Sequence, residues 1–302
     1  MATSLTPPGP AAMAAPAARR RRRRNEPDEG GRTNWVGTAL LILCSLTVLI
    51  PLYFTVAMAL KSAQQTASGT GFAWPWPMHF DNFATAWSLT NFPRAFTISL
   101  LITVFTVAGL IFLSSAAAWA IARNWERPLF RWSYFYLLAA MFIPFPVIAL
   151  PQIKFTSILH LSNPAGVTIL HILFGLSFNV LLYSAFLRSI PYELEESARL
   201  DGATTWQTFW KLIFPLLAPM NATVGIFAFL QAWNDFMMPS LVTANPQLQT
   251  LPVIQNIFQS QFSSNFNVAF ASYLMAMAPT VVAYLFAQRW VMTGVTRGAI
   301  KG

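Results

Sequence analysis

The chain has 302 residues, of which 55% are hydrophobic, 15% aromatic and only 10% charged. Its mean hydropathy is +0.50. Because soluble domains carry about 25% charged residues, this composition argues against a soluble cytosolic enzyme. The formal net charge of +9 fits nucleic-acid binding, anionic-lipid binding or a membrane topology signal, and the positions of the charges decide among them.

Cysteine and histidine are too sparse for a metal centre. The single cysteine, Cys44, lies inside an apolar run, which excludes an intrachain disulfide and any cysteine-rich metal site. The three histidines, His79, His160 and His171, are scattered along the chain. We therefore predict no metal site.

Six uncharged runs predict an all-α integral membrane protein with six transmembrane helices. About 20 apolar residues suffice to cross the hydrocarbon core as a helix. Lipid cannot satisfy free backbone groups, so spans must be helices or a closed barrel, and these runs lack the alternation of barrel strands. The runs cover residues 35–60, 95–122, 132–150, 167–187, about 216–234 and about 268–288.

Two of these runs admit a second interpretation. The first follows an arginine stretch, as a signal peptide does. Its apolar part exceeds the roughly 7–15 residues of a secretory signal, which favours a retained membrane anchor. Pro144, Pro146 and Pro151 interrupt the third run. They favour a kinked helix over a broken one that lines a cavity.

The basic residues predict the orientation of the chain. Arg19–Arg24 and Arg32 precede the first span. If that end is cytoplasmic, 16 of the 19 Lys and Arg residues fall inside, and only Lys61, Arg94 and Lys154 fall outside. The positive-inside rule then places both termini in the cytoplasm. The excess charge is thereby explained as topology, and no basic patch with interleaved aromatics supports a nucleic-acid partner.

Composition also divides the chain into regions. Residues 1–34 are rich in Ala, Pro, Arg and Gly and poor in large apolar residues, which predicts a disordered basic cytoplasmic tail that touches anionic lipid. Residues 35–302 are predicted to form one transmembrane domain, with a core at 95–290 and a polar cytoplasmic loop at 189–219.

The polar loop holds four of the ten acidic residues. Pro191 suits the first turn of a helix that runs to about Leu200. The acidic residues Glu193, Glu195 and Glu196 then lie near the positive end of the helix dipole. The loop is therefore predicted to begin with a short helix on the cytoplasmic side.

A turn and a second helix are predicted to follow. Asp201-Gly202 is a turn signal, because glycine readily adopts a positive φ. Thr204 and Gln207 form a capping box, which starts a helix that carries exposed aromatic residues. Such a helix-turn-helix either docks on a protein partner or rests on lipid, and the two interpretations weigh about evenly on these residues alone.

The same loop carries a recognisable spacing. Glu196-Ser197-Ala198, Gly202, Leu212 and Phe214-Pro215 resemble the EAA loop of ABC importer permeases, in which EAA, three residues, G, nine residues, I, one residue, L and P follow in order. Ser197, Leu212 and Phe214 depart mildly from this pattern, whereas the glycine and the proline are kept. The wider string EESARLDGA, WNDF at 233–236 and the closing GAIKG resemble the smaller permease of maltose-type carbohydrate importers.

The resemblance covers about residues 35–302 and implies a type I ABC importer permease in a bacterial plasma membrane. In that family the loop is a coupling helix that docks on a cytoplasmic ATPase dimer, and a second homologous permease completes the cavity. The sugar, a di- or oligosaccharide, arrives on an extracytoplasmic binding protein. ATP and Mg then belong to the ATPase; this chain is no enzyme and binds no cofactor, in keeping with its lack of a GxxxxGK[ST] sequence.

The resemblance also assigns residues to docking. Glu196 and Asp201 can accept charge-assisted hydrogen bonds from basic groups on the ATPase, and Gly202 permits the turn. The predicted coupling residues are Glu193, Glu196, Ser197, Ala198, Asp201, Gly202, Ala203 and Pro215.

A few polar residues within the spans could contact a sugar. Asp235 indicates a functional site, because an acidic side chain within the membrane costs free energy and is usually kept for function. A solvated helix end explains its position equally well. The other predicted substrate-pathway residues are Asn179, Gln231, Trp233 and Asn234. His171 is isolated from any acid in the sequence, so interhelical hydrogen bonding is its favoured role. Residues 251–262 are predicted to form a short helix that is external or re-entrant.

Two other functional classes compete with the importer. A proton-coupled secondary transporter or channel would need neither the 193–215 loop nor an ATPase, and it would need more intramembrane acids. A membrane-bound enzyme would need a cluster of acid, base or nucleophile on one face, and no such cluster is visible in the sequence.

Overall fold

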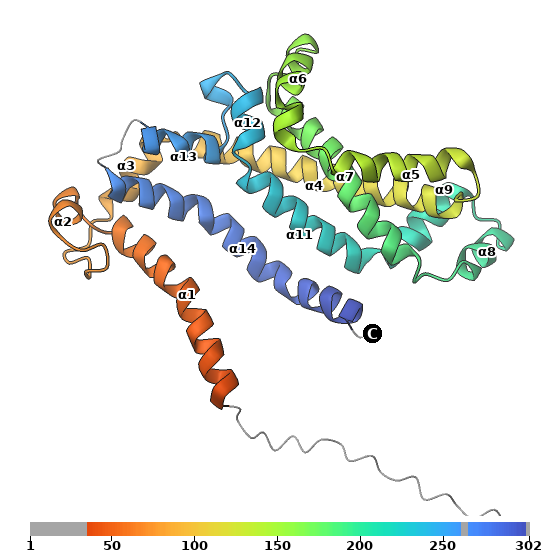
Figure 1. Cartoon of the computed structure of the whole chain (residues 1–302), viewed down its shortest axis with the longest axis horizontal. Coiled ribbons are helices and arrows are strands. Elements are labelled where there is room, and N and C mark those ends of the chain that lie inside the picture. The colour runs from red at the N-terminus through yellow and green to blue at the C-terminus, as the bar shows by residue number, and fades with distance from the viewer. Residues whose placement is uncertain (1–34, 261–264, 300–302) are drawn as a thin grey trace, which may run out of the picture. The chain divides into compact units, whose positions relative to one another are not determined.

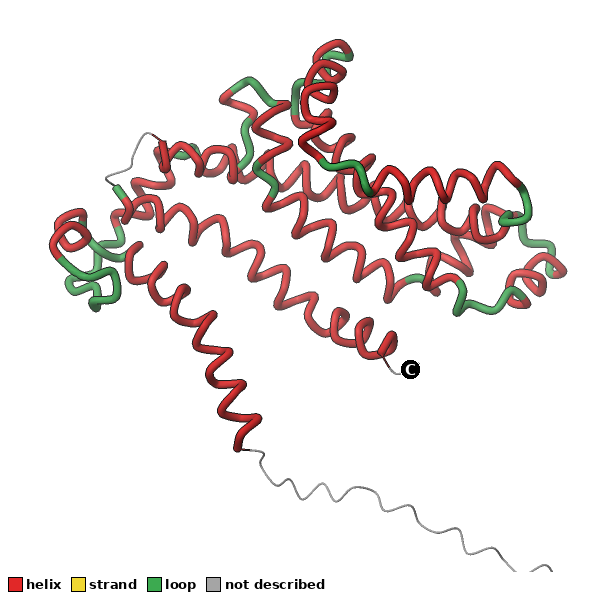
Figure 2. The backbone as a smooth tube through the Cα atoms, viewed as in Figure 1, coloured by secondary structure: helices red, strands yellow, loops and turns green. Residues whose placement is uncertain are grey.

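The computed structural model describes residues 35–260 and 265–299, and every regular element in these ranges is a helix (Figure 2). The chain divides into two compact units, the first ending at Leu49 and the second starting at Ile50. Helix α1 (Trp35–Ala59) contains this boundary. The predicted disordered tail, residues 1–34, lies outside the described residues.

Four of the described helices are long and apolar enough to cross a membrane. They are α1, α4 (Phe92–Arg123), α7 (Pro164–Leu187) and residues 266–286 of α14 (Phe266–Ala299). The number reaches six only if each of two sharply bent helix pairs forms one span. One pair contains α11 (Ala218–Asn234), the predicted fifth span, which is bent by 75° from residues 205–216.

The third predicted span is a broken helix, so the expectation of a kink was wrong. Helix α5 (Pro128–Met141) ends before Pro144, and α6 (Phe145–Ile158) starts after it at an angle of 104°. Pro144 has no N–H to continue α5 and disfavours helical backbone at the residue before it. Pro146 then lies in the first turn of α6, where a proline is well tolerated.

Helix α4 is the centre of the second unit. It packs against α7 and α11, and α11 packs against α14 (Figure 1). Glycines permit the close approach of α4 and α7, because a Cβ at Gly175 would lie 2.8 Å from Leu110 Cδ1 and one at Gly109 would lie 2.4 Å from Ile172 Cδ1. Small residues are the usual means by which membrane helices approach this closely.

Several of the short helices lie at two opposite ends of the second unit (Figure 1). At one end, α2 (Ala63–Ser68), α3 (Asp81–Leu89) and α13 (Leu251–Ser260) all pack against α14. At the other end lie α8 (Glu193–Leu200) and α9 (Thr205–Thr208). The remaining short elements are η1 (Phe209–Ile213), α10 (Phe214–Leu216), α12 (Met237–Val242) and η2 (Pro246–Leu248).

Candidate functional site

The polar loop forms the predicted helix-turn-helix. Helix α8 ends at Leu200, as expected, although it begins at Glu193, two residues after Pro191. The capping box is present: Gln207 N–H donates to Thr204 Oγ1 at 3.2 Å, and Thr204 N–H donates to Gln207 Oε1 at 2.9 Å. Reciprocal bonds of this kind satisfy two of the free amides at the start of α9.

Gly202 makes the turn between the two helices. Its φ is +81°, a left-handed conformation that only glycine adopts freely. Gly202 N–H donates to Arg199 O at 3.0 Å, and Ala203 N–H donates to Ala198 O at 2.9 Å. These two bonds form a Schellman motif, which closes the C-terminus of α8 and sets the direction of the chain towards α9.

The predicted coupling residues are mostly accessible. Ala198 and Ala203 are half-buried, whereas six others are exposed: Glu193, Glu196, Ser197, Asp201, Gly202 and Pro215. A Cβ added at Gly202 would meet no atom within 4 Å. The turn therefore presents an open surface in which exposed carboxylates precede the glycine along the chain.

The aromatic residues after the capping box are less exposed than predicted. Trp206 is 69% exposed, but Trp210 is half-buried and Phe209 is buried. The helix widens at η1, where Phe214 N–H donates to Phe209 O five residues earlier. Such a π-turn is rare and frequently marks a functional segment. Here it leads into the bend before α11.

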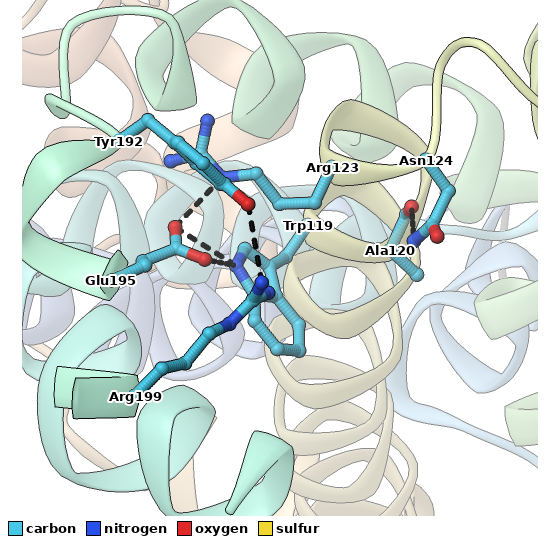
Figure 3. Close-up of polar contacts among 7 residues, drawn as sticks. All are labelled: Trp119, Ala120, Arg123, Asn124, Tyr192, Glu195 and Arg199. Atoms are coloured by element: carbon cyan, nitrogen blue, oxygen red, sulfur yellow. Dashed lines mark hydrogen bonds and ion pairs between the residues drawn. The ribbon is translucent and has the colours of Figure 1, made fainter. Parts of the chain in front are cut away.

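Glu195, a buried acidic residue of α8, attaches this helix to the end of α4 (Figure 3). The Glu195 side chain is 0% exposed, and its Oε1 lies 2.7 Å from Arg123 Nε at the end of α4. Trp119 Nε1 donates to both carboxylate oxygens at 3.2 Å. The Tyr192 ring lies against the guanidinium groups of Arg123 and Arg199, at 5.4 and 5.8 Å from its centroid.

This cluster was missed at the level of the sequence. Glu195 was grouped with Glu193 and Glu196 as a residue that favours the helix dipole, and its partner Arg123 is 72 residues away in the chain. The helical spacing of Tyr192, Glu195 and Arg199 on one face of α8 is the available signal. That spacing does not reveal which face is buried.

A cavity of about 470 Å³ lies where the broken third span meets α7, α11 and α12. It contains His171 and Asp235, whose Nε2 and Oδ2 atoms are 3.4 Å apart. His171 is therefore not isolated from an acid, because folding brings α7 and the end of α11 together. The residues that line the cavity are Ala140, Met141, Ile143, Phe145, Ile148, His171, Phe174, Leu230, Gln231, Asn234, Asp235, Met237 and Met238.

Three of the predicted substrate-pathway residues, Gln231, Asn234 and Asp235, line this cavity, and two do not. Trp233 is 2% exposed, and its indole N–H donates to Ala276 O at 3.1 Å in a smaller cavity that Gln255 also lines. Asn179 is buried inside α7 and donates to Gly175 O at 2.8 Å. Trp233 and Asn179 therefore lie apart from the cavity that contains Asp235, and their contact with substrate stays a prediction.

Asp235 is the one acidic residue in the described part of the chain that lines the cavity containing His171, and the lining residues include neither lysine nor arginine. Asp235 Oδ1 accepts from Met237 N–H at 3.0 Å, which orients the carboxylate at the end of α11. Among the described residues no three His, Cys, Asp or Glu side chains form a group that could hold a metal ion. The cavity is thus suited to an uncharged, hydroxyl-rich ligand rather than to an anion.

The predicted helix at 251–262 is present as α13, which ends at Ser260. Gln255 Nε2 donates to Ser272 O of α14 at 3.1 Å, so this side chain helps to hold α13 in place. Residues 261 and 262 lie outside the described residues.

Comparison with known proteins gives consistent matches. Residues 111–297 match the family described as binding-protein-dependent transport system inner membrane component. The chain is 32% identical over 264 residues to the probable starch degradation products transport system permease protein AmyC of Thermoanaerobacterium thermosulfurigenes, covering 87% of this chain and 96% of that protein. It is 32% identical over 267 residues to the melibiose/raffinose/stachyose import permease protein MelC of Bacillus subtilis (strain 168), covering 88% and 96%.

The fold also matches that of a solved structure. A chain of a bacterial ABC transporter involved in the import of the acidic polysaccharide alginate superposes with a TM-score of 0.71, covering 84% of this chain and 95% of that one. The sequence identity is 24%, so this likeness concerns the fold.

Proposed function

Because this chain belongs to the family of binding-protein-dependent transport system inner membrane components, we propose that it forms one half of a sugar pathway and couples it to a separate ATPase. The chain is a permease subunit of a carbohydrate ABC importer, a multi-pass protein of the bacterial inner membrane. The proposed partners are an extracytoplasmic sugar-binding protein, a second homologous permease and a cytoplasmic ATPase dimer that holds ATP and Mg.

The helix-turn-helix α8–α9 is the proposed docking element for the ATPase. The observation that carries this proposal is the exposed turn at Gly202, which is conformationally fixed yet has open space in front of it. The adjacent Glu196 and Asp201 carboxylates are exposed and can accept hydrogen bonds from basic groups on the ATPase. Docking then requires a close approach of the ATPase surface to the turn.

The Gly202→Asp variant tests this proposal. An added Cβ meets no atom of this chain within 4 Å, so the variant has room to fold despite the strain of a side chain at this positive φ. The added carboxylate projects into the space reserved for the ATPase. We expect uptake of a mixture of labelled maltotriose, raffinose and trehalose by proteoliposomes to fall by at least about tenfold, equivalent to about 1.4 kcal/mol of docking energy. Co-purification of the ATPase should fall in parallel.

Asn91→Asp is the matched control. Asn91 is exposed, has a φ of 44°, and lies at the start of α4, at the end of the second unit opposite to α8. It therefore introduces an aspartate at another residue of positive φ, away from the proposed docking surface. Normal uptake and normal ATPase binding by Gly202→Asp would refute the docking role.

The cavity that contains Asp235 is the proposed binding place for sugar on its way through the membrane. Asp235, Asn234 and Gln231 supply polar groups at one wall, and the opposite wall from the broken third span is mainly apolar. Saccharides combine hydroxyl groups with apolar ring faces, which matches such a lining. Two of the relatives are named for the transport of starch degradation products and of melibiose, raffinose and stachyose.

A further inference from the structure

Helix α8 is attached to the rest of the second unit in an unusual way. Glu195 is the one residue of α8 that is fully buried, whereas its leucines, Leu194 and Leu200, are 42% and 89% exposed. A short amphipathic helix normally holds its position by burying apolar side chains. In α8 an ionised side chain occupies the inward position.

The surroundings of Glu195 compensate for its burial. A carboxylate without water is strongly destabilised unless it is paired and hydrogen-bonded. Arg123 Nε donates at 2.7 Å, and the indole of Trp119 donates to both oxygens at 3.2 Å. Arg123 and Trp119 are separated by one turn at the C-terminal end of α4, so a single helix supplies the donors.

Trp119 also connects the C-terminal end of α4 to η1, which lies in the second half of the polar loop. Its ring centroid lies 5.3 Å from that of Phe209, which is buried in η1 directly after α9. The end of α4 therefore contacts both sides of the turn at Gly202, through charge on α8 and through aromatic packing on η1.

We propose that the Glu195–Arg123 ion pair is a positioning device that fastens α8 to α4, so that movement of the docked loop is passed to the central helix of the second unit. A charged pair suits this role because its geometry is directional, whereas an apolar contact would let α8 slide on its support. Since α4 packs against α7 and α11, a displacement of α8 reaches the helices that bear His171 and Asp235. The proposal rests on the docking function of α8–α9.

Spin labels test the attachment directly in the complete transporter, reconstituted in nanodiscs. Leu200→Cys in α8 and Leu113→Cys in α4 are both exposed positions, and Cys44→Ala removes the native thiol. When Glu195 and Arg123 are both present, the two spin labels should give one narrow distance distribution, with and without ATP. Glu195→Gln and Arg123→Gln should each widen it by about twofold or more, because the remaining buried partner drives local opening.

Two further variants separate positioning from general stability. The exchanged pair Glu195→Arg with Arg123→Glu should restore part of the narrow distribution, because it re-forms the ion pair although Trp119 then has no acceptor at residue 195. Trp119→Phe removes the indole donor but keeps a ring against Phe209, and should widen the distribution less. Glu126→Gln, an exposed acid three residues beyond Arg123, should change nothing.

The same variants are measured for ATP hydrolysis and for uptake of the saccharide mixture. We expect the amount of sugar moved per ATP to fall about tenfold in Glu195→Gln while ATPase binding is retained, and to recover in the exchanged pair. The proposal is overturned if Glu195→Gln keeps the narrow distance and full coupling, or if it only lowers the yield of complex. A failure of docking itself would appear instead as normal uptake by Gly202→Asp.

Discussion

Asp235 is the one acidic side chain among the described residues that line the cavity, and in the proposed function it contacts the hydroxyl groups of the sugar. Its carboxylate is oriented by Met237 N–H and faces His171 at 3.4 Å, longer than an ordinary hydrogen bond. Because no lysine or arginine lines the cavity, an acidic sugar would have only the neighbouring His171 to offset the charge of Asp235. A neutral saccharide can instead donate its hydroxyl hydrogens to the carboxylate.

Asp235→Asn keeps the shape of the side chain and removes its charge. Hydrogen bonds to a charged group contribute about 1.5–3 kcal/mol. We therefore expect the initial rate of saccharide uptake at low concentration to fall by about 10-fold to 100-fold. Asp81→Asn, an exposed acid in the first turn of α3, is the control and should transport normally. Equal uptake by the two variants would remove Asp235 from the sugar pathway.

Helix termini give the coupling segment its defined shape. The Schellman motif at Gly202 closes α8, and the capping box at Thr204 opens α9 only two residues later. Since α9 has four residues, its own backbone bonds contribute little, and the cap accounts for much of its order. In the third span a proline interrupts the helix. Pro144 separates α5 from α6, and the neighbouring Ile143 and Phe145 line the cavity.

Thr204→Ala tests the contribution of the cap. Loss of an N-cap hydroxyl costs about 1 kcal/mol, so the amides of residues 205–208 should exchange with deuterium about fivefold faster. Thr205→Ala alters the neighbouring exposed threonine but leaves both bonds of the capping box, and its exchange should match the native chain. Unchanged exchange in Thr204→Ala would show that tertiary contacts alone hold α9.

The second unit as a whole has two distinct ends. Helices α2 and α3, predicted to be extracytoplasmic, and α13, predicted to be external or re-entrant, each pack on α14, and the proposed docking element lies at the opposite end (Figure 1). This separation is what a transporter needs if a binding protein delivers sugar on one side and an ATPase acts on the other. The basic residues predict which end is cytoplasmic.

Labelling with a membrane-impermeant maleimide tests this orientation. In a Cys44→Ala background, Ser88→Cys in α3 and Leu200→Cys in α8 are both exposed positions. Ser88→Cys should react in intact spheroplasts, whereas Leu200→Cys should react only after the membrane is opened. Reaction of both thiols from the same side would contradict the predicted topology.

Local sequence signals determined the helices, the turn and the caps of this protein. Uncharged runs, the proline positions, Asp201-Gly202 and the Thr204–Gln207 pair each act within a few residues of the chain, where backbone preferences and short-range hydrogen bonds decide the outcome. The family resemblance of the loop also depended on local spacing alone.

Only the tertiary structure decided which polar side chains meet. Glu195 and Arg123 are 72 residues apart, and His171 and Asp235 lie on different helices, so no periodicity connects them. The same reason explains why Trp233 and Asn179 lie apart from the cavity that contains Asp235: helix packing turns both side chains into the core. Burial and partner choice depend on contacts between distant segments, which the order of residues does not contain.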